Sequence, residues 1–287
     1  FIPVSQLTYL TGRAVPVAAG PIDALRSPSD TAKDRPRREQ AGIELLLDAL
    51  SRSESPAFVS VVGSARAVAA AWNREPKLLE QKVRAVVVNA GATTGKPGAE
   101  WNVDLDVQAW IALMRSPLPI LWYPCTGEHG PTGLDPHNTY WPVSHRRLFD
   151  GLPQSLRAFF DYAFHHHSRG DAIRSLSSLG AGPSWEKVLV DRRNMWSTAS
   201  LILAAGRVLA QTADGWRFVA KERAGGLVLQ PLELIPITCQ VDDGGVIRWS
   251  ASANAGKIKI FHRKPDEEHV RAMGEATNAL LRQMPLG

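Results

Sequence analysis

Residues 84–123 contain the stretch that decides the fold. The run RAVVV at 84–88 is followed by NAGATTGKPGAEWNVDLD at 89–106, by VQAWIALMRS at 107–116 and by PILWY at 119–123. The first and last runs indicate buried strands, and the third indicates a helix. Because α/β proteins place their ligands at the carboxyl ends of parallel strands, the loop at 89–106 is the first candidate for a functional site.

Upstream of this stretch, strands and helices also alternate at short spacing. Apolar residues at helical spacing predict an amphipathic helix at 40–52, and a second helix is predicted at 65–73, followed by a short one that starts at Pro76. Strands are predicted at 14–18 and 57–62. This alternation predicts a parallel sheet covered by helices on both faces.

The second half of the chain is less regular. Predicted there are helices at 156–166, 195–205 and 265–284, an antiparallel hairpin of 232–241 and 246–249, and a strand at 257–261. The expected fold class is therefore α/β, with a mostly parallel central sheet, helices on both of its faces, and a small antiparallel hairpin in the C-terminal half.

Composition narrows the class of partner. The net charge of +5 is spread along the 287 residues, and the densest basic stretch, KDRPRR at 33–38, is typical of a solvated loop, so no nucleic-acid partner is expected. No apolar run reaches the roughly eighteen residues that a membrane helix needs, so a soluble protein with no membrane partner is expected. Cys125 and Cys239 are interpreted as free thiols, with a single bridge as the alternative, which leaves the compartment open between cytoplasm and export.

Three short motifs are only weak indications of a catalytic or ligand-binding function. GATTGK at 91–96 departs from the phosphate-loop spacing, and Pro97 stands where that motif needs Ser or Thr. His165–His167 are interpreted as a water-exposed helix end, because adjacent helical residues point in different directions. Cys125, near His129, is interpreted as a structural cysteine because the sequence identifies no partner that would orient a base.

Glu100 and Asn102 form a more specific pair. A carboxylate and a carboxamide two residues apart, above a strand end, can point into one pocket, and their acceptors and donor suit sugar hydroxyls. Trp101 between them is expected to pack beneath the loop. Asp106 precedes the helix at 107–116 and is predicted to be its N-cap.

These segments together resemble a known family. AEWNVDLD at 99–106, followed by Gln108-Ala109 and by SPLP at 116–119, resembles the nucleoside hydrolase family, in which Ala-Glu-Phe-Asn precedes an Asp-capped helix and a Ser-Gly-x-Pro strand entry. The resemblance covers about residues 14–123 in order and spacing and is weaker beyond. Three further segments agree with it, namely PVAAG at 16–20, GSARAVA at 63–69 and VVVNAGA at 86–92.

The resemblance implies a reaction and a ligand. Members of the family hydrolyse the N-glycosidic bond of ribonucleosides with a water held by Ca²⁺, a hard cation that lowers the pKa of that water. By resemblance, Glu100 and Asn102 would bind ribose hydroxyls, Asn89 and Thr94 would line the sugar pocket, and the main-chain carbonyl of Arg66 would be a calcium ligand. The implied partner is a small-molecule nucleoside or sugar. Homo-oligomer formation stays open, because members of the family self-associate.

The chain also departs from the family pattern. The family's Asp-rich motif after its first strand is absent here and is expected upstream of Phe1, so residues 1–287 are interpreted as one nucleoside hydrolase-like domain that lacks its N-terminal strand and motif. The family's second metal element, a His-Asp pair, corresponds to RNMWSTA at 193–199, where only Asn194 and Ser197 offer oxygen donors.

The sequence also leaves two alternative functions and several candidates for the proton donor. A non-catalytic sugar- or nucleoside-binding protein on the same scaffold is the alternative, and an α/β protein with a purely structural Glu100 loop is a third interpretation. His129, His137 and His145 follow the strand at 119–123 and are candidates for the acid that protonates the leaving group, because His is the commonest proton donor near neutral pH.

Overall fold

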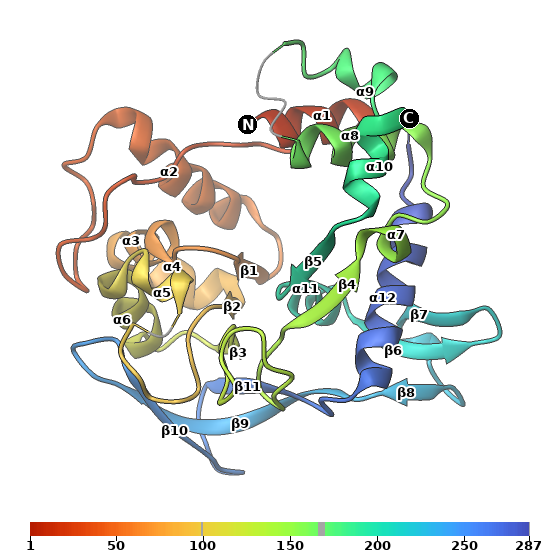
Figure 1. The fold of residues 1–287 in the computed structure, drawn as a ribbon. Helices are drawn as coiled ribbons and strands as arrows, with labels where there is room; N and C mark the ends of the chain where they lie inside the picture. The colour runs from red at the N-terminus through yellow and green to blue at the C-terminus, as the bar shows by residue number, and fades with distance from the viewer. Residues whose placement is uncertain (99, 166–169, 287) are drawn as a thin grey trace.

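The computed structural model describes residues 1–98, 100–165 and 170–286, and a six-stranded sheet forms the centre of this part of the chain (Figure 1). Strands β1, β2, β3 and β11 are parallel to one another, and the hairpin of β9 and β10 continues the sheet in antiparallel pairing. Both predicted features, the mostly parallel sheet and the hairpin, are confirmed. In spatial order the strands are β1 (Ala57–Val61), β2 (Val83–Asn89), β3 (Ile120–Tyr123), β11 (Ile258–Arg263), β9 (Leu232–Val241) and β10 (Ile247–Ala251).

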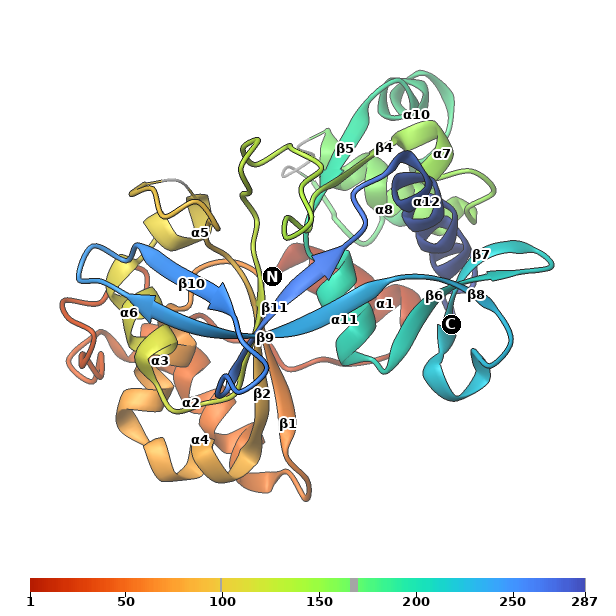
Figure 2. The ribbon, with the colours of Figure 1, turned by 90° about the horizontal axis from the view of Figure 1, so that it is seen from below.

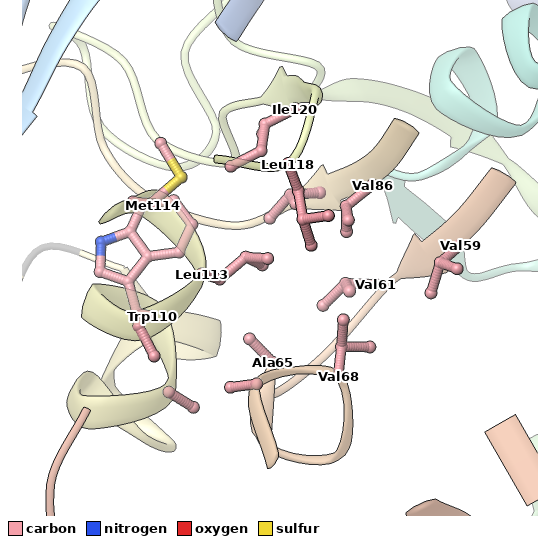
Figure 3. Packing of buried hydrophobic residues seen from close by; sticks show 14 of the residues in the cluster. Val59, Val61, Ala65, Val68, Val86, Trp110, Leu113, Met114, Leu118 and Ile120 are labelled. Carbon is pink, nitrogen blue, oxygen red and sulfur yellow. The ribbon is translucent and has the colours of Figure 1, made fainter. Parts of the chain in front are cut away.

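Helices cover both faces of the sheet, as the alternation predicted. Successive valines of β2 point to opposite faces because side chains alternate along a strand. Val86 (Figure 3) and Val88 pack into the large cluster on the face that carries most of the helices, whereas Val87 packs with Ala199 of α11 on the other face. The helices of the first face are α2 (Arg37–Arg52), α3 (Arg66–Arg74), α4 (Pro76–Lys82) and α6 (Val107–Arg115), and α11 is Thr198–Ala204.

A second hydrophobic cluster lies beside the sheet, around the C-terminal helix α12 (Glu267–Arg282). Figure 2 shows β9 running from this region, where it follows β8, into the central sheet. The predicted helix at 265–284 is confirmed, and the Asp266 side chain caps it by accepting from the His269 N–H. The other elements here are α1 (Ile2–Thr11), β4 (Trp141–Ser144), α7 (His145–Leu148), α8 (Gln154–Phe164), α9 (Ser175–Ser178), α10 (Gly182–Leu189), β5 (Arg192–Met195), β6 (Arg207–Thr212), β7 (Gly215–Ala220), η1 (Lys221–Arg223) and β8 (Val228–Gln230).

Two local predictions are wrong. Residues 14–18 are not a strand: Val15 and Val17 are 63% and 42% exposed, and no described strand pairs with the segment, so its backbone has no ladder to join. The helix predicted at 195–205 begins only at Thr198, because residues up to Met195 pair with β4 as the antiparallel strand β5. Within the described residues, no helix combines the length and the low polarity that crossing a lipid bilayer requires.

Candidate functional site

A cavity of about 590 Å³ opens at the carboxyl ends of β1, β2 and β3. This is the edge where a parallel sheet places ligands. The segments that follow β1, β2 and β3 form three parts of the cavity wall, and the residues just before α11 form a fourth part. The cavity is lined by Val62, Gly98, Glu100, Trp101, Asn102, Asp104, Cys125, Thr126, Pro131, Trp196 and Ser197.

The Glu100 side chain is held by the backbone of its own loop. Glu100 is the N-cap of α5 (Trp101–Asp104): Oε1 accepts from the Asn102 N–H at 3.1 Å, and Oε2 accepts from the Val103 N–H at 3.1 Å. Oε2 also accepts from the Gly91 N–H at 2.7 Å. Gly91 has φ +86°, and a Cβ there would lie 2.9 Å from the Trp110 ring, so this position needs glycine.

Burial and hydrogen bonding act on Glu100 in opposite directions. Burial raises the pKa of its carboxyl, the three N–H donors lower it, and the nearby Asp104 carboxylate raises it further, with a net upward direction. The side chain therefore closes the loop onto the end of β2 and also forms part of the cavity wall.

Replacing Glu100 with Ala should lower the free energy of unfolding by about 2–4 kcal/mol, because three backbone N–H groups lose their acceptor in a mostly buried site. Urea unfolding measures the change. Glu80→Ala is the matched control: Glu80 is exposed on α4 and forms no ion pair within the described residues, so its loss should stay within about 0.5 kcal/mol. Equal stability of the two variants would contradict the capping role of Glu100.

Asn102 lines the same cavity as Glu100, so the predicted pair does face one space. Its Nδ2 donates to the Asn89 carbonyl at 2.9 Å. Asn89 is fully buried and does not line the cavity: its Nδ2 donates to the Val61 carbonyl, and its Oδ1 accepts from Ser200 Oγ at 2.8 Å. Asn89 therefore supports Asn102 from beneath. Thr94 lies in a turn away from the cavity lining.

Trp101 departs from its predicted packing. Its side chain does not lie beneath the loop: Trp101 is 74% exposed and stands on the cavity wall. Trp196 forms another part of the wall, and its Nε1 donates to the Pro131 carbonyl at 3.0 Å. Sequence reasoning missed this aromatic lining, although a Trp between two polar candidates in a loop was a usable signal.

The three histidine candidates do not line the cavity. His129 is exposed and lies 2.5 Å from Asp135, which raises the pKa of its imidazole. His137 Nδ1 lies 2.8 Å from the Phe261 carbonyl, and burial lowers its pKa. His145 belongs to the second cluster region, stacked on Phe164, and burial lowers its pKa too. The leaving-group acid thus stays unassigned.

The structure also bears on two further predictions, those for the two cysteines and for His165. Cys125 and Cys239 are free thiols, as predicted, and burial raises the pKa of Cys125, which disfavours its thiolate and supports the structural interpretation. The exposed helix end is wrong for His165, whose side chain is only 26% exposed and whose Nδ1 lies 2.7 Å from Asp161 Oδ1. His166 and His167 lie outside the described residues.

Comparison with solved structures identifies the fold. A plant nucleoside hydrolase aligns over 94% of this chain and 80% of its own, with 14% identity and a TM-score of 0.50. The chain has the nucleoside hydrolase fold. No protein-family model and no curated protein matches it.

Two bacterial structures with the nucleoside hydrolase fold also align. One is a purine-preferring ribonucleoside hydrolase from Gardnerella vaginalis, with 11% identity over 84% of this chain and a TM-score of 0.43. The other is an inosine-uridine preferring nucleoside hydrolase from Bacillus anthracis, with 12% identity over 82% of this chain and a TM-score of 0.36. The chain spans 66% and 65% of their lengths, slightly under two thirds.

The residues proposed for calcium do not form a cage. The Arg66 guanidinium donates to Asp106 Oδ2 at 2.9 Å and to the Leu105 carbonyl at 2.5 Å, and Arg66 does not line the cavity. Asn194 Oδ1 accepts from the Tyr140 hydroxyl, and of the three proposed ligands only Ser197 lines the cavity. Residues 1–98, 100–165 and 170–286 include no group of three His, Cys, Asp or Glu side chains placed to hold a metal ion. These residues therefore do not fit Ca²⁺.

Proposed function

We propose that the cavity binds a nucleoside or a related N-riboside, and that the protein hydrolyses its N-glycosidic bond. The observation that carries the proposal is the mixed lining at the ligand edge of the sheet. Its volume of about 590 Å³ falls within the range of small-molecule pockets, roughly 300–1,000 Å³. A nucleoside fits this description because it joins a planar base to a hydroxylated sugar.

The two halves of such a ligand match two kinds of side chain. The indole rings of Trp101 and Trp196 offer flat apolar surface to a base. Asn102, Thr126 and Ser197 offer donors and acceptors to sugar hydroxyls. The amide of Asn102 is also held in place by its bond to the Asn89 carbonyl, which limits its freedom before a ligand arrives.

Hydrolysis in this cavity would proceed through a sugar that carries positive charge. Water attacks the anomeric carbon while the carbon–nitrogen bond breaks; the bonding electrons pass to the base nitrogen, which takes up a proton, and the water loses one. A wall that carries carboxylates, and no Lys or Arg among its described lining residues, suits the positively charged sugar of the transition state.

A non-catalytic nucleoside-binding protein is the second candidate. Two observations favour it: the Glu100 carboxylate accepts hydrogen bonds from three backbone N–H groups, and none of the three histidine candidates lines the cavity. The described residues then provide recognition, with no side chain yet assigned to protonate the leaving base.

Calorimetry and base release together test the proposal. We expect inosine or uridine to bind with a Kd below about 1 mM and free base to appear on chromatography. Each assay is run with added Ca²⁺ and with a chelator. Binding without base release would favour the second candidate, whereas an absence of both binding and release would overturn the proposal.

A further inference from the structure

Two carboxylates line the cavity, and they differ in burial and in hydrogen bonding. Glu100 is buried, and both of its oxygens accept backbone hydrogen bonds. Asp104 ends α5 one turn later, where its N–H donates to the Glu100 carbonyl. Asp104 is exposed, and its side chain forms no hydrogen bond or ion pair with the described residues. Glu100 Oε2 already accepts two backbone hydrogen bonds and Oε1 accepts one, whereas both oxygens of the Asp104 carboxylate are left for a ligand among the described residues.

Among the described residues, no positive side chain on this wall offsets the charge of Asp104. The described residues that line the 590 Å³ cavity include neither Lys nor Arg. Lys96 lines a smaller neighbouring cavity of about 60 Å³, which Asp104 also borders, but no ion pair joins the two within the described part of the chain. The described lining therefore carries carboxylates and no cation, and the field of Asp104 acts on a ligand in the cavity.

We propose that Asp104 is the carboxylate that contacts the ligand, and that it gives the cavity its preference for uncharged over anionic ligands. The inference rests on the proposed function. A carboxylate accepts hydrogen bonds from sugar hydroxyls. It also repels a negatively charged phosphate group that lies a few ångströms away, even when some water lies between the two groups. A nucleoside is thus accepted and a nucleoside monophosphate rejected.

Calorimetry on the whole chain with inosine and inosine 5′-monophosphate at low ionic strength tests this, because salt would screen the effect. Wild-type protein should bind inosine at least tenfold more tightly than the monophosphate. Asp104→Asn should narrow that ratio by about tenfold, since a unit charge a few ångströms away is worth roughly that factor. Asp104→Lys should bind the monophosphate more tightly than wild type does.

Glu80→Gln is the matched control, because it removes the same charge from an exposed position on α4, at the amino end of β2 and away from the cavity. It should keep the wild-type ratio, and thermal unfolding of the Asp104 variants should match wild type. An unchanged ratio in Asp104→Asn, with inosine binding intact, would overturn this inference alone. Failure of the wild-type protein to bind either ligand would overturn the proposed function and this inference with it.

Discussion

Replacing Asp106 with Ala is expected to lower the free energy of unfolding by about 3–5 kcal/mol, because it breaks a buried ion pair and removes a helix cap. Asp106 Oδ1 accepts from the Ala109 N–H at 2.9 Å and starts α6. Oδ2 accepts from the Leu25 N–H at 2.8 Å and from Arg66 Nε at 2.9 Å. The aspartate side chain is 0% exposed and that of Arg66 is 14% exposed, so the variant would leave a charge without its partner.

Urea unfolding of Asp106→Ala beside Asp243→Ala measures this effect. Asp243 also pairs with an arginine, Arg115 at 2.7 Å, but its side chain is 95% exposed. Its removal should cost less than about 1 kcal/mol, because water and salt screen a surface pair. Asp106→Asn should fall between the two, since the amide oxygen can still cap α6. A loss below 1 kcal/mol for Asp106→Ala would show that Arg66 finds another partner.

Acidification from pH 7 to pH 5 is expected to destabilise the fold by about 2 kcal/mol through His269 alone. Burial, with the neighbouring Arg263 cation, lowers the pKa of His269 to about 3, whereas the unfolded chain titrates near 6.5. Because the folded pKa is depressed, the unfolded state binds the proton first. The stability is complete above pH 6.5 and is lost progressively as the pH falls toward 3.

Chemical unfolding at several pH values between 5 and 7 measures the slope. His269→Gln should flatten it by about 1.4 kcal/mol per pH unit below pH 6, the value for one proton. Burial also lowers the pKa of His137 and His145, so a residual slope of the same sign should remain. A slope unchanged in His269→Gln would contradict a neutral, buried imidazole at this position.

The fold was predictable because its signals are local. The apolar run at 84–88, the helix at 107–115 and the Asp106 cap each follow from the spacing of a few neighbouring residues. The hairpin of β9 and β10 likewise follows from its turn. The prediction of a strand at 14–18 was wrong because a strand also needs a neighbouring strand to pair with. The sequence of the segment alone does not show whether such a neighbour exists.

The sequence indicated where the site lies, but it did not show how the side chains of the site are held. Glu100 and Asn102 share a cavity, as their spacing indicated. The engagement of Glu100 depends on the Gly91 N–H, whose direction follows from a backbone conformation that only the folded loop sets. Trp196 reaches the wall from a segment almost a hundred residues away in sequence, and short-range spacing cannot show such an approach.

The pairing of β3 with β11 has a consequence for biosynthesis. One edge of β3 pairs with β2, but the other edge pairs with β11, which is synthesised much later than β3. While the nascent polypeptide leaves the ribosome, that edge offers unpaired amides and carbonyls to other chains. Because long-range pairing of this kind forms late and slowly, we expect the partly synthesised protein to need protection from aggregation more than a bundle of local contacts would.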